Sequence, residues 1–196
     1  MTPFISYYYD KNPLQSKFYK ECSLNLEKQL NYFGYKLISD NINFASMGIE
    51  AYDKLNLYKP TFILNKIKEL NSSVVWIDAD AQIFDSLTEF DGIDDACDIG
   101  FATREHDNTT PHAAFIYFNN TQGSINFLKL WETQCKEKYH IPYDCTEHCI
   151  LVELFKEIDP PIRVYNFLNL ASISNKTKIR IGISPAGWEY ERNKTK

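Results

Sequence analysis

Two aspartates, Asp78 and Asp80, directly follow the apolar run 73–77, SVVWI. Such a run indicates a strand buried on both faces, and ligands of open α/β sheets bind at the carboxyl ends of these strands. Residues i and i+2 near a strand end project to one side, so both carboxylates can approach one point. Two carboxylates repel each other unless a cation lies between them, and oxygen ligands suit Mg²⁺ or Mn²⁺. The pattern predicts a metal site that can hold a diphosphate; the alternative is that both aspartates only cap the following turn.

The segments that must position this pair alternate between strand and helix patterns. Strands that alternate with helices form parallel sheets with crossover connections, which predicts an α/β fold with a mixed, mainly parallel central sheet flanked by helices. A single domain is expected over 1–190, with the polar residues 191–196 as a linker within a larger protein. The expected strands are 4–9, 35–39, 73–77, 98–102, 113–118, 162–167 and 178–183, and the expected helices are 14–33, the segment that begins at Pro60, 124–138 and 146–156.

Composition and charge exclude several classes of protein. The formal net charge is −5, which argues against binding of a nucleic-acid backbone. We expect no membrane span, because no apolar stretch approaches the length of a transmembrane helix. The sequence contains 5 cysteines and its first residues lack the pattern of a signal peptide, so we expect reduced thiols and a cytoplasmic location.

The order of these features resembles the GT-A family of nucleotide-sugar glycosyltransferases, over most of the chain. Asp78-Ala79-Asp80 matches the DxD motif of that family. The segment 115–121 (FIYFNNT) is similar to its acceptor-side region, and 143–147 (YDCTE) resembles the acidic position that opens a late helix. The resemblance implies a Rossmann-like GT-A fold and Mn²⁺ or Mg²⁺ as cofactor. It also implies transfer of a sugar from a nucleoside-diphosphate donor, with a UDP-sugar favoured, to a hydroxyl of a glycan or glycoprotein.

The same resemblance implies where the nucleoside binds. The family holds it at the first strand and at the end of the second strand, which here are Tyr7, Tyr8 and Tyr9, and Asp40. A tyrosine ring could stack on the base, and Asp40 could accept a hydrogen bond from the base or the ribose. The alternative is that the tyrosines belong to the core and that Asp40 is a turn residue.

Three basic residues are candidates for binding the diphosphate or the sugar. Lys59 lies at the start of the helix that begins at Pro60, and Lys66 lies further along it. Arg104 follows an expected strand, and its guanidinium donates hydrogen bonds in a fixed fork that suits phosphate. A surface salt bridge is the alternative role for Arg104.

Sugar transfer also needs an acid–base group on the acceptor side. Asp144 and Glu147 are one helical turn apart and can share a face. Asp144 also occupies the position of a helix N-cap, which is its structural alternative. No histidine follows His148, so phosphates and water are expected to complete the metal shell.

Two other interpretations compete with an active glycosyltransferase. A haloacid-dehalogenase-like phosphatase also has an Asp-x-Asp pair, but that class needs Thr or Val two positions after the second aspartate, where this chain has Gln82. A catalytically dead module that binds a nucleotide sugar is the other alternative. Measured turnover separates a dead module from an enzyme.

The role of Asp144 can be tested with the Asp144→Asn variant. Loss of a general base should lower turnover by roughly 10²–10⁴-fold while donor affinity changes little. Asparagine is as good an N-cap as aspartate, so near-normal turnover with a natural acceptor would reduce Asp144 to a structural cap.

Overall fold

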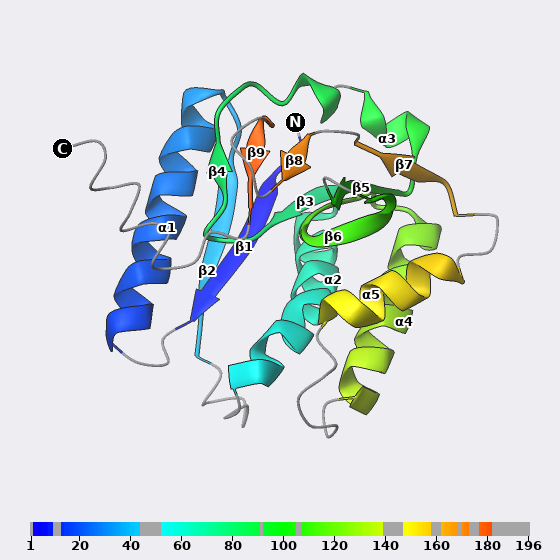
Figure 1. Cartoon of the computed structure of the whole chain (residues 1–196). Helices are drawn as coiled ribbons and strands as arrows, with labels where there is room; N and C mark the ends of the chain where they lie inside the picture. The colour runs from blue at the N-terminus through cyan, green and yellow to red at the C-terminus, as the bar shows by residue number, and fades with distance from the viewer. Residues whose placement is uncertain are drawn as a thin grey trace.

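The computed structural model describes residues 2–9, 13–43, 52–90, 92–104, 107–138, 147–157, 162–167, 170–172 and 177–181. Within this part of the chain the fold is a layered α/β structure (Figure 1). A central sheet separates one long helix from a group of three helices. This arrangement confirms the α/β class expected from the alternation of strand and helix patterns.

The central sheet of the described residues has six strands in the order β2-β1-β3-β6-β5-β7. Neighbouring strands are parallel except at β6, which is antiparallel to both β3 and β5. The mainly parallel, mixed sheet predicted from the sequence is therefore confirmed. The strands are β1 (Phe4–Tyr9), β2 (Leu37–Ile42), β3 (Val74–Ile77), β5 (Ile99–Arg104), β6 (Asp107–Phe118) and β7 (Val164–Asn166).

Helices cover both faces of this sheet, as expected for a buried parallel sheet. On one face, α1 (Pro13–Tyr32) buries Leu26 and Leu30 against Phe4 and Val75 of the strands. On the other, α2 (Lys59–Leu70), α4 (Gln122–Lys138) and α5 (Glu147–Lys156) share a second core with Ile5 and Trp76. Pro60 supports the start of α2, because its fixed φ suits the first helical turn and its missing N–H costs no hydrogen bond there. The short helices are η2 (Tyr52–Tyr58), η3 (Thr88–Phe90) and α3 (Ile93–Ala96).

The main departure from the predicted strand pattern lies near the carboxyl end of the described chain. A strand was expected at 178–183, but β9 covers only Ile179–Arg180 and belongs to a separate three-stranded sheet with β4 (Gln82–Ile83) and β8 (Ala171–Ser172). These strands are two residues long, too short to give a pattern that differs from a loop. Residues 182–196, including the expected linker, lie outside the described residues.

None of the described helices has both the length and the apolar content that a bilayer span requires.

Candidate active site

A cavity of about 220 Å³ lies at the carboxyl ends of β1 and β3. This is the edge at which open α/β sheets bind ligands. Polar and aromatic groups dominate its lining, and among the described residues Ala79 is the only apolar aliphatic side chain in it. The lining residues are Tyr7, Tyr8, Tyr9, Tyr19, Asn56, Lys59, Trp76, Asp78, Ala79 and Asp80.

Asp78 and Asp80 both line this cavity, but a turn rather than a continuing strand brings them there. β3 ends at Ile77, and the N–H of Ala81 donates to the carbonyl of Asp78 at 3.0 Å. The predicted alternation of side chains along a strand therefore does not extend to Asp80. The N–H of Asp78 donates to the carbonyl of Ala114 at 3.0 Å, which anchors the start of the turn to β6.

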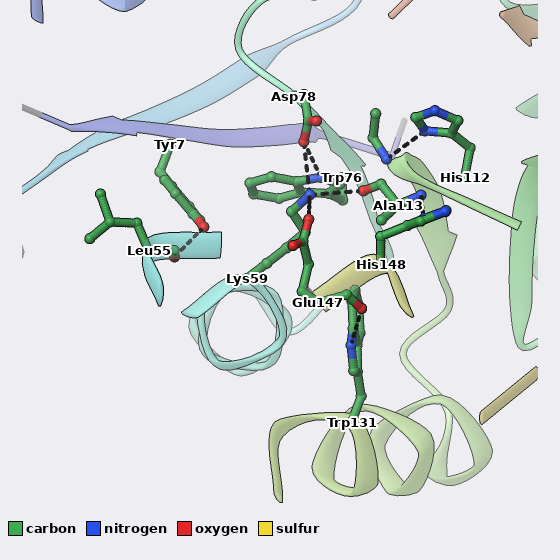
Figure 2. A network of polar contacts seen from close by, with 11 residues as sticks. Tyr7, Leu55, Lys59, Trp76, Asp78, His112, Ala113, Trp131, Glu147 and His148 are labelled. Carbon is green, nitrogen blue, oxygen red and sulfur yellow. Dashed lines mark hydrogen bonds and ion pairs between the residues drawn. The ribbon is translucent and has the colours of Figure 1, made fainter. Parts of the chain in front are cut away.

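The ammonium group of Lys59 occupies the centre of the buried part of the site (Figure 2). It donates to Oδ1 of Asp78, to Oε1 of Glu147 and to the carbonyl of Ala113, each at 3.0 Å. The side chain is 4% exposed. Since a lysine ammonium has three N–H donors, these three acceptors use all of them.

Lys59 was predicted to contact the diphosphate, and its geometry instead makes it an internal counter-ion. Burial by itself lowers the pKa of Lys59, but the carboxylates of Asp78 and Glu147 outweigh burial and raise it above the ordinary lysine value. The group is therefore charged at neutral pH, with every donor occupied by the protein. A phosphate could bind it only by displacing one of these partners.

Trp76 is a site residue that was not predicted from the sequence. Its indole Nε1 donates to Oδ1 of Asp78 at 2.9 Å, and its ring lies 5.0 Å from the Lys59 ammonium, within cation–π range. The Trp76 side chain is 2% exposed, so it orients Asp78 from the core. The signal was present in the sequence, because residues 76 and 78 are separated by two and share one side of the strand end.

Asp80 has a different electrostatic environment from Asp78. Burial and the negative charge of Asp78 raise the pKa of Asp80 to about 7, although Lys59 partly opposes this. Asp80 also raises the pKa of Cys22 after the larger effect of burial, which places Asp80 towards α1. The charge of Asp78 is thus compensated by Lys59. Ionisation of Asp80 is disfavoured in the metal-free site, and a bound cation would favour it.

Glu147, predicted as a catalytic residue, opens α5 behind Lys59 and does not line the cavity. Its side chain is 7% exposed and its Oε1 accepts from Lys59. Its backbone carbonyl accepts from the indole Nε1 of Trp131 at 3.1 Å, which fixes the helix start to α4. Oε2 is buried and has no hydrogen-bond partner among the described residues.

The predicted nucleoside residues separate into two groups. Tyr7 is 6% exposed, and its hydroxyl donates to the carbonyl of Leu55 at 3.2 Å, so its ring packs beneath the cavity. This agrees with the core alternative for Tyr7 rather than a stacking role. Tyr8 and Tyr9 are half-buried at the cavity, and the ring of Tyr9 lies 5.8 Å from that of Tyr19.

Asp40 was expected to end the second strand beside the nucleoside, and its observed position does not fit that role. β2 continues to Ile42, because it pairs with β1 residue by residue and Asp40 lies opposite Tyr7. The Asp40 carboxylate forms an ion pair with Lys66 of α2 at 2.9 Å and is not among the residues that line the cavity.

Two further predicted residues have no described side chain. Arg104 is the last residue of β5, and only its backbone is described. Asp144 lies outside the described residues, so its predicted acid–base role stays a prediction. Tyr19 and Asn56 line the cavity without having been predicted, since neither belongs to a motif.

The donor set suits a divalent cation held jointly with a ligand. Among the described residues, no group of three or more His, Cys, Asp or Glu side chains could bind a metal by itself. Asp80, with its raised pKa, supplies a hard oxygen in need of positive charge, and Asp78 lines the same cavity. Mg²⁺ and Mn²⁺ commonly take few protein ligands and complete their shells with water and phosphate.

The buried ion pairs predict a large effect on stability for Lys59→Met. Two carboxylates would lose their counter-ion, which should cost about 3–5 kcal/mol of unfolding free energy in urea titrations. Lys66→Met is the matched control in the same helix: its partners Asp40 and Glu69 are 37% and 60% exposed, so its loss should cost about 1 kcal/mol or less. Lys59→Met/Glu147→Gln should recover part of the loss. A cost for Lys59→Met as small as that of the control would contradict the counter-ion role.

The raised pKa of Asp80 predicts a pH dependence of stability in metal-free protein. The folded state holds this proton more tightly than the unfolded chain, so the stabilisation is complete below about pH 4 and is lost as pH rises towards 7. Relative to Asp80→Asn, the wild type should lose about 2–4 kcal/mol over that interval, measured by urea unfolding in chelator. Parallel pH profiles for the two proteins would show that Asp80 is not perturbed in this way.

Comparison with known proteins finds matches among solved structures. No protein-family model matches the chain, and no curated protein matches its sequence. A glycosyltransferase involved in glycosylation of the major capsid of PBCV-1 superposes with a TM-score of 0.70 at 12% identity, over 98% of each chain. GlyE from Streptococcus pneumoniae TIGR4 gives 0.59 at 12% identity, over 97% of this chain and 60% of its own. The galactosyltransferase LgtC gives 0.56 at 12% identity, over 99% and 94%. The chain therefore has the GT-A fold of these glycosyltransferases, as its DxD-containing pattern predicts.

Proposed function

We propose that this protein is a metal-dependent glycosyltransferase that uses a nucleoside-diphosphate sugar as donor. The observation that carries the proposal is the position of Asp78 and Asp80 in a cavity at the carboxyl ends of β1 and β3. The GT-A fold shared with three glycosyltransferases supports the same reaction class.

The two aspartates have different roles in this proposal. Asp80 binds Mn²⁺ or Mg²⁺ directly, because among the described residues no ion pair compensates its charge, and burial and Asp78 raise its pKa. Asp78, held by Lys59 and Trp76, binds a metal-bound water or the ribose through its other oxygen. The metal, when bound, neutralises the charge that develops on the departing diphosphate. An acidic protein can thereby bind a polyanionic donor.

The nucleoside is placed along the aromatic side of the cavity. Tyr8, Tyr9 and Tyr19 line this side, and aromatic rings stack on the faces of bases. A UDP-sugar is the favoured donor. Asp40 has no part in this placement, because its carboxylate is directed to Lys66 on the α2 side of the sheet.

The acceptor, a glycan or glycoprotein hydroxyl, is placed on the side of β6 and α5. Lys59 connects the two sides, since its ammonium bridges Asp78 at the cavity and Glu147 at the start of α5. Glu147 then acts as a positioning residue for Lys59 and Asp78 rather than as the group that takes the acceptor proton. That proton passes to an acid–base group on the acceptor side, for which Asp144 stays our candidate.

The metal and donor roles can be tested by thermal shift with UDP-sugars in the presence and absence of Mn²⁺. At a donor concentration of about 100 times the Kd, binding should raise the wild-type Tm by about 5–10 °C, and only with Mn²⁺. Asp80→Asn should abolish the Mn²⁺-dependent shift while keeping the fold. Asp85→Asn, at an exposed aspartate outside the cavity, is the control and should behave as wild type.

An undiminished Mn²⁺-dependent shift in Asp80→Asn would contradict the assignment of Asp80. Product analysis with the same donors separates the remaining alternatives. Sugar transfer or slow donor hydrolysis supports an enzyme, whereas binding without turnover of any donor indicates a dead module.

A further inference from the structure

A second cavity, of about 540 Å³, lies at the edge of the central sheet that is formed by β2. Residues of β2 form the floor of this cavity. One wall is α1 and the other is the end of α2, which contributes Glu69 and Leu70. Among the described residues, β1 is the only strand that is hydrogen-bonded to β2. An edge strand presents backbone donors and acceptors to which another strand can pair.

The charges on the α1 wall are arranged so that the wall is complementary to a copy of itself. Its four lining residues are spaced i, i+3, i+4, i+7 on one helix face, and they are Lys20, Ser23, Leu24 and Glu27. Lys20 and Glu27 are exposed at opposite ends of this face, and Leu24 near its centre is 48% exposed. If a copy of this face is turned by 180°, Lys20 meets Glu27 at both ends and small or apolar side chains meet between them.

The strand β2 and the residue before it repeat this pattern. Lys36, Ile38 and Asp40 alternate along the chain and therefore share one face of the sheet. In an antiparallel pair of two such strands centred on Ile38, Lys36 of each copy lies directly opposite Asp40 of the other. Opposite charges in this position stabilise cross-strand pairing, and like charges weaken it.

The midpoint of the charge pattern on α1 and the midpoint of the pattern on β2 lie beside each other. The hydroxyl of Ser23 in α1 donates to the hydroxyl of Ser39 in β2 at 2.8 Å. Ser23 and Leu24 are the middle of the α1 face, and Ser39 adjoins Ile38. One two-fold axis can therefore relate both elements to their copies, which is the requirement for a closed, isologous dimer.

We propose that a second copy of this chain binds here, with β2 paired antiparallel to the partner copy's β2 and α1 packed against its α1. The two central sheets then form one continuous sheet, and the 540 Å³ cavity is filled across the axis. Asp40 accepts from Lys66 of its own chain and faces Lys36 of the other copy. Edge lysines often only prevent strand pairing, but here each lysine has an acidic residue at the symmetry-related position.

Sedimentation velocity over a range of concentrations tests this interface. The wild-type chain should form a dimer, and Leu24→Glu should be monomeric because two negative charges, one from each copy, would meet near the axis where the two leucines packed. Leu130→Glu is the matched control, since Leu130 is 49% exposed on α4 at the other face of the sheet, and it should dimerise as wild type. Circular dichroism spectra verify that all variants are folded.

A charge-exchange series identifies the pairing itself. Lys20→Glu should weaken dimerisation by about tenfold, because two attractive contacts per dimer become repulsive. Lys20→Glu/Glu27→Lys should restore the wild-type affinity. A monomeric wild type, a dimer that is insensitive to Leu24→Glu, or a double variant as weak as Lys20→Glu would each overturn the proposal.

Discussion

The structure of the site depends on one buried cation, the ammonium group of Lys59. Its three donors join β3 through Asp78, β6 through the carbonyl of Ala113, and α5 through Glu147. A buried lysine is costly to desolvate, and paired carboxylates with good geometry offset that cost. Because the elements come from distant parts of the chain, the same contact that compensates the charge also fixes the position of Asp78 at the cavity. The difference between Asp78 and Asp80 follows directly: in the described part of the chain, Asp78 has an ion pair with Lys59 and Asp80 has none.

The surrounding core makes this arrangement rigid. Tyr7, Phe62 and Trp76 pack edge to face and tilted beneath the cavity, with ring centroids 5.1–5.9 Å apart. Trp76 has both packing and polar functions, because its ring contacts Lys59 while its Nε1 holds Asp78. A side chain held by packing and by hydrogen bonds loses little freedom when a ligand binds. The metal site that we propose is therefore preorganised on the Asp78 side, and it becomes complete only when a nucleoside diphosphate supplies further oxygens.

Most of the fold, and the position of the aspartate pair at the cavity, could be predicted from local pattern. The apolar run before Asp78, the helical spacing in α1 and the Pro60 signal in α2 each have a short-range cause, and all three elements are present. The role of Lys59 was not predictable, because its partners Glu147 and Ala113 are 88 and 54 residues away in the chain. The end of the second strand was not predictable for a related reason: pairing with β1 extends β2 past Asp40, a residue that in isolation indicates a turn. Local sequence thus predicts the elements, whereas tertiary contacts assign the charged residues to their roles.

We propose that Asp80 binds the metal of a donor complex while Lys59 stays with Asp78 and Glu147. A crystal structure with Mn²⁺ and a nucleoside diphosphate tests it most directly, because the anomalous signal of manganese locates the ion independently of the surrounding density. We expect an anomalous peak about 2.0–2.3 Å from an oxygen of the Asp80 carboxylate and from phosphate oxygens, with the Lys59 contacts unchanged. A manganese ion bound away from Asp80, or a Lys59 ammonium that has left Glu147 to bind the phosphates, would contradict these roles.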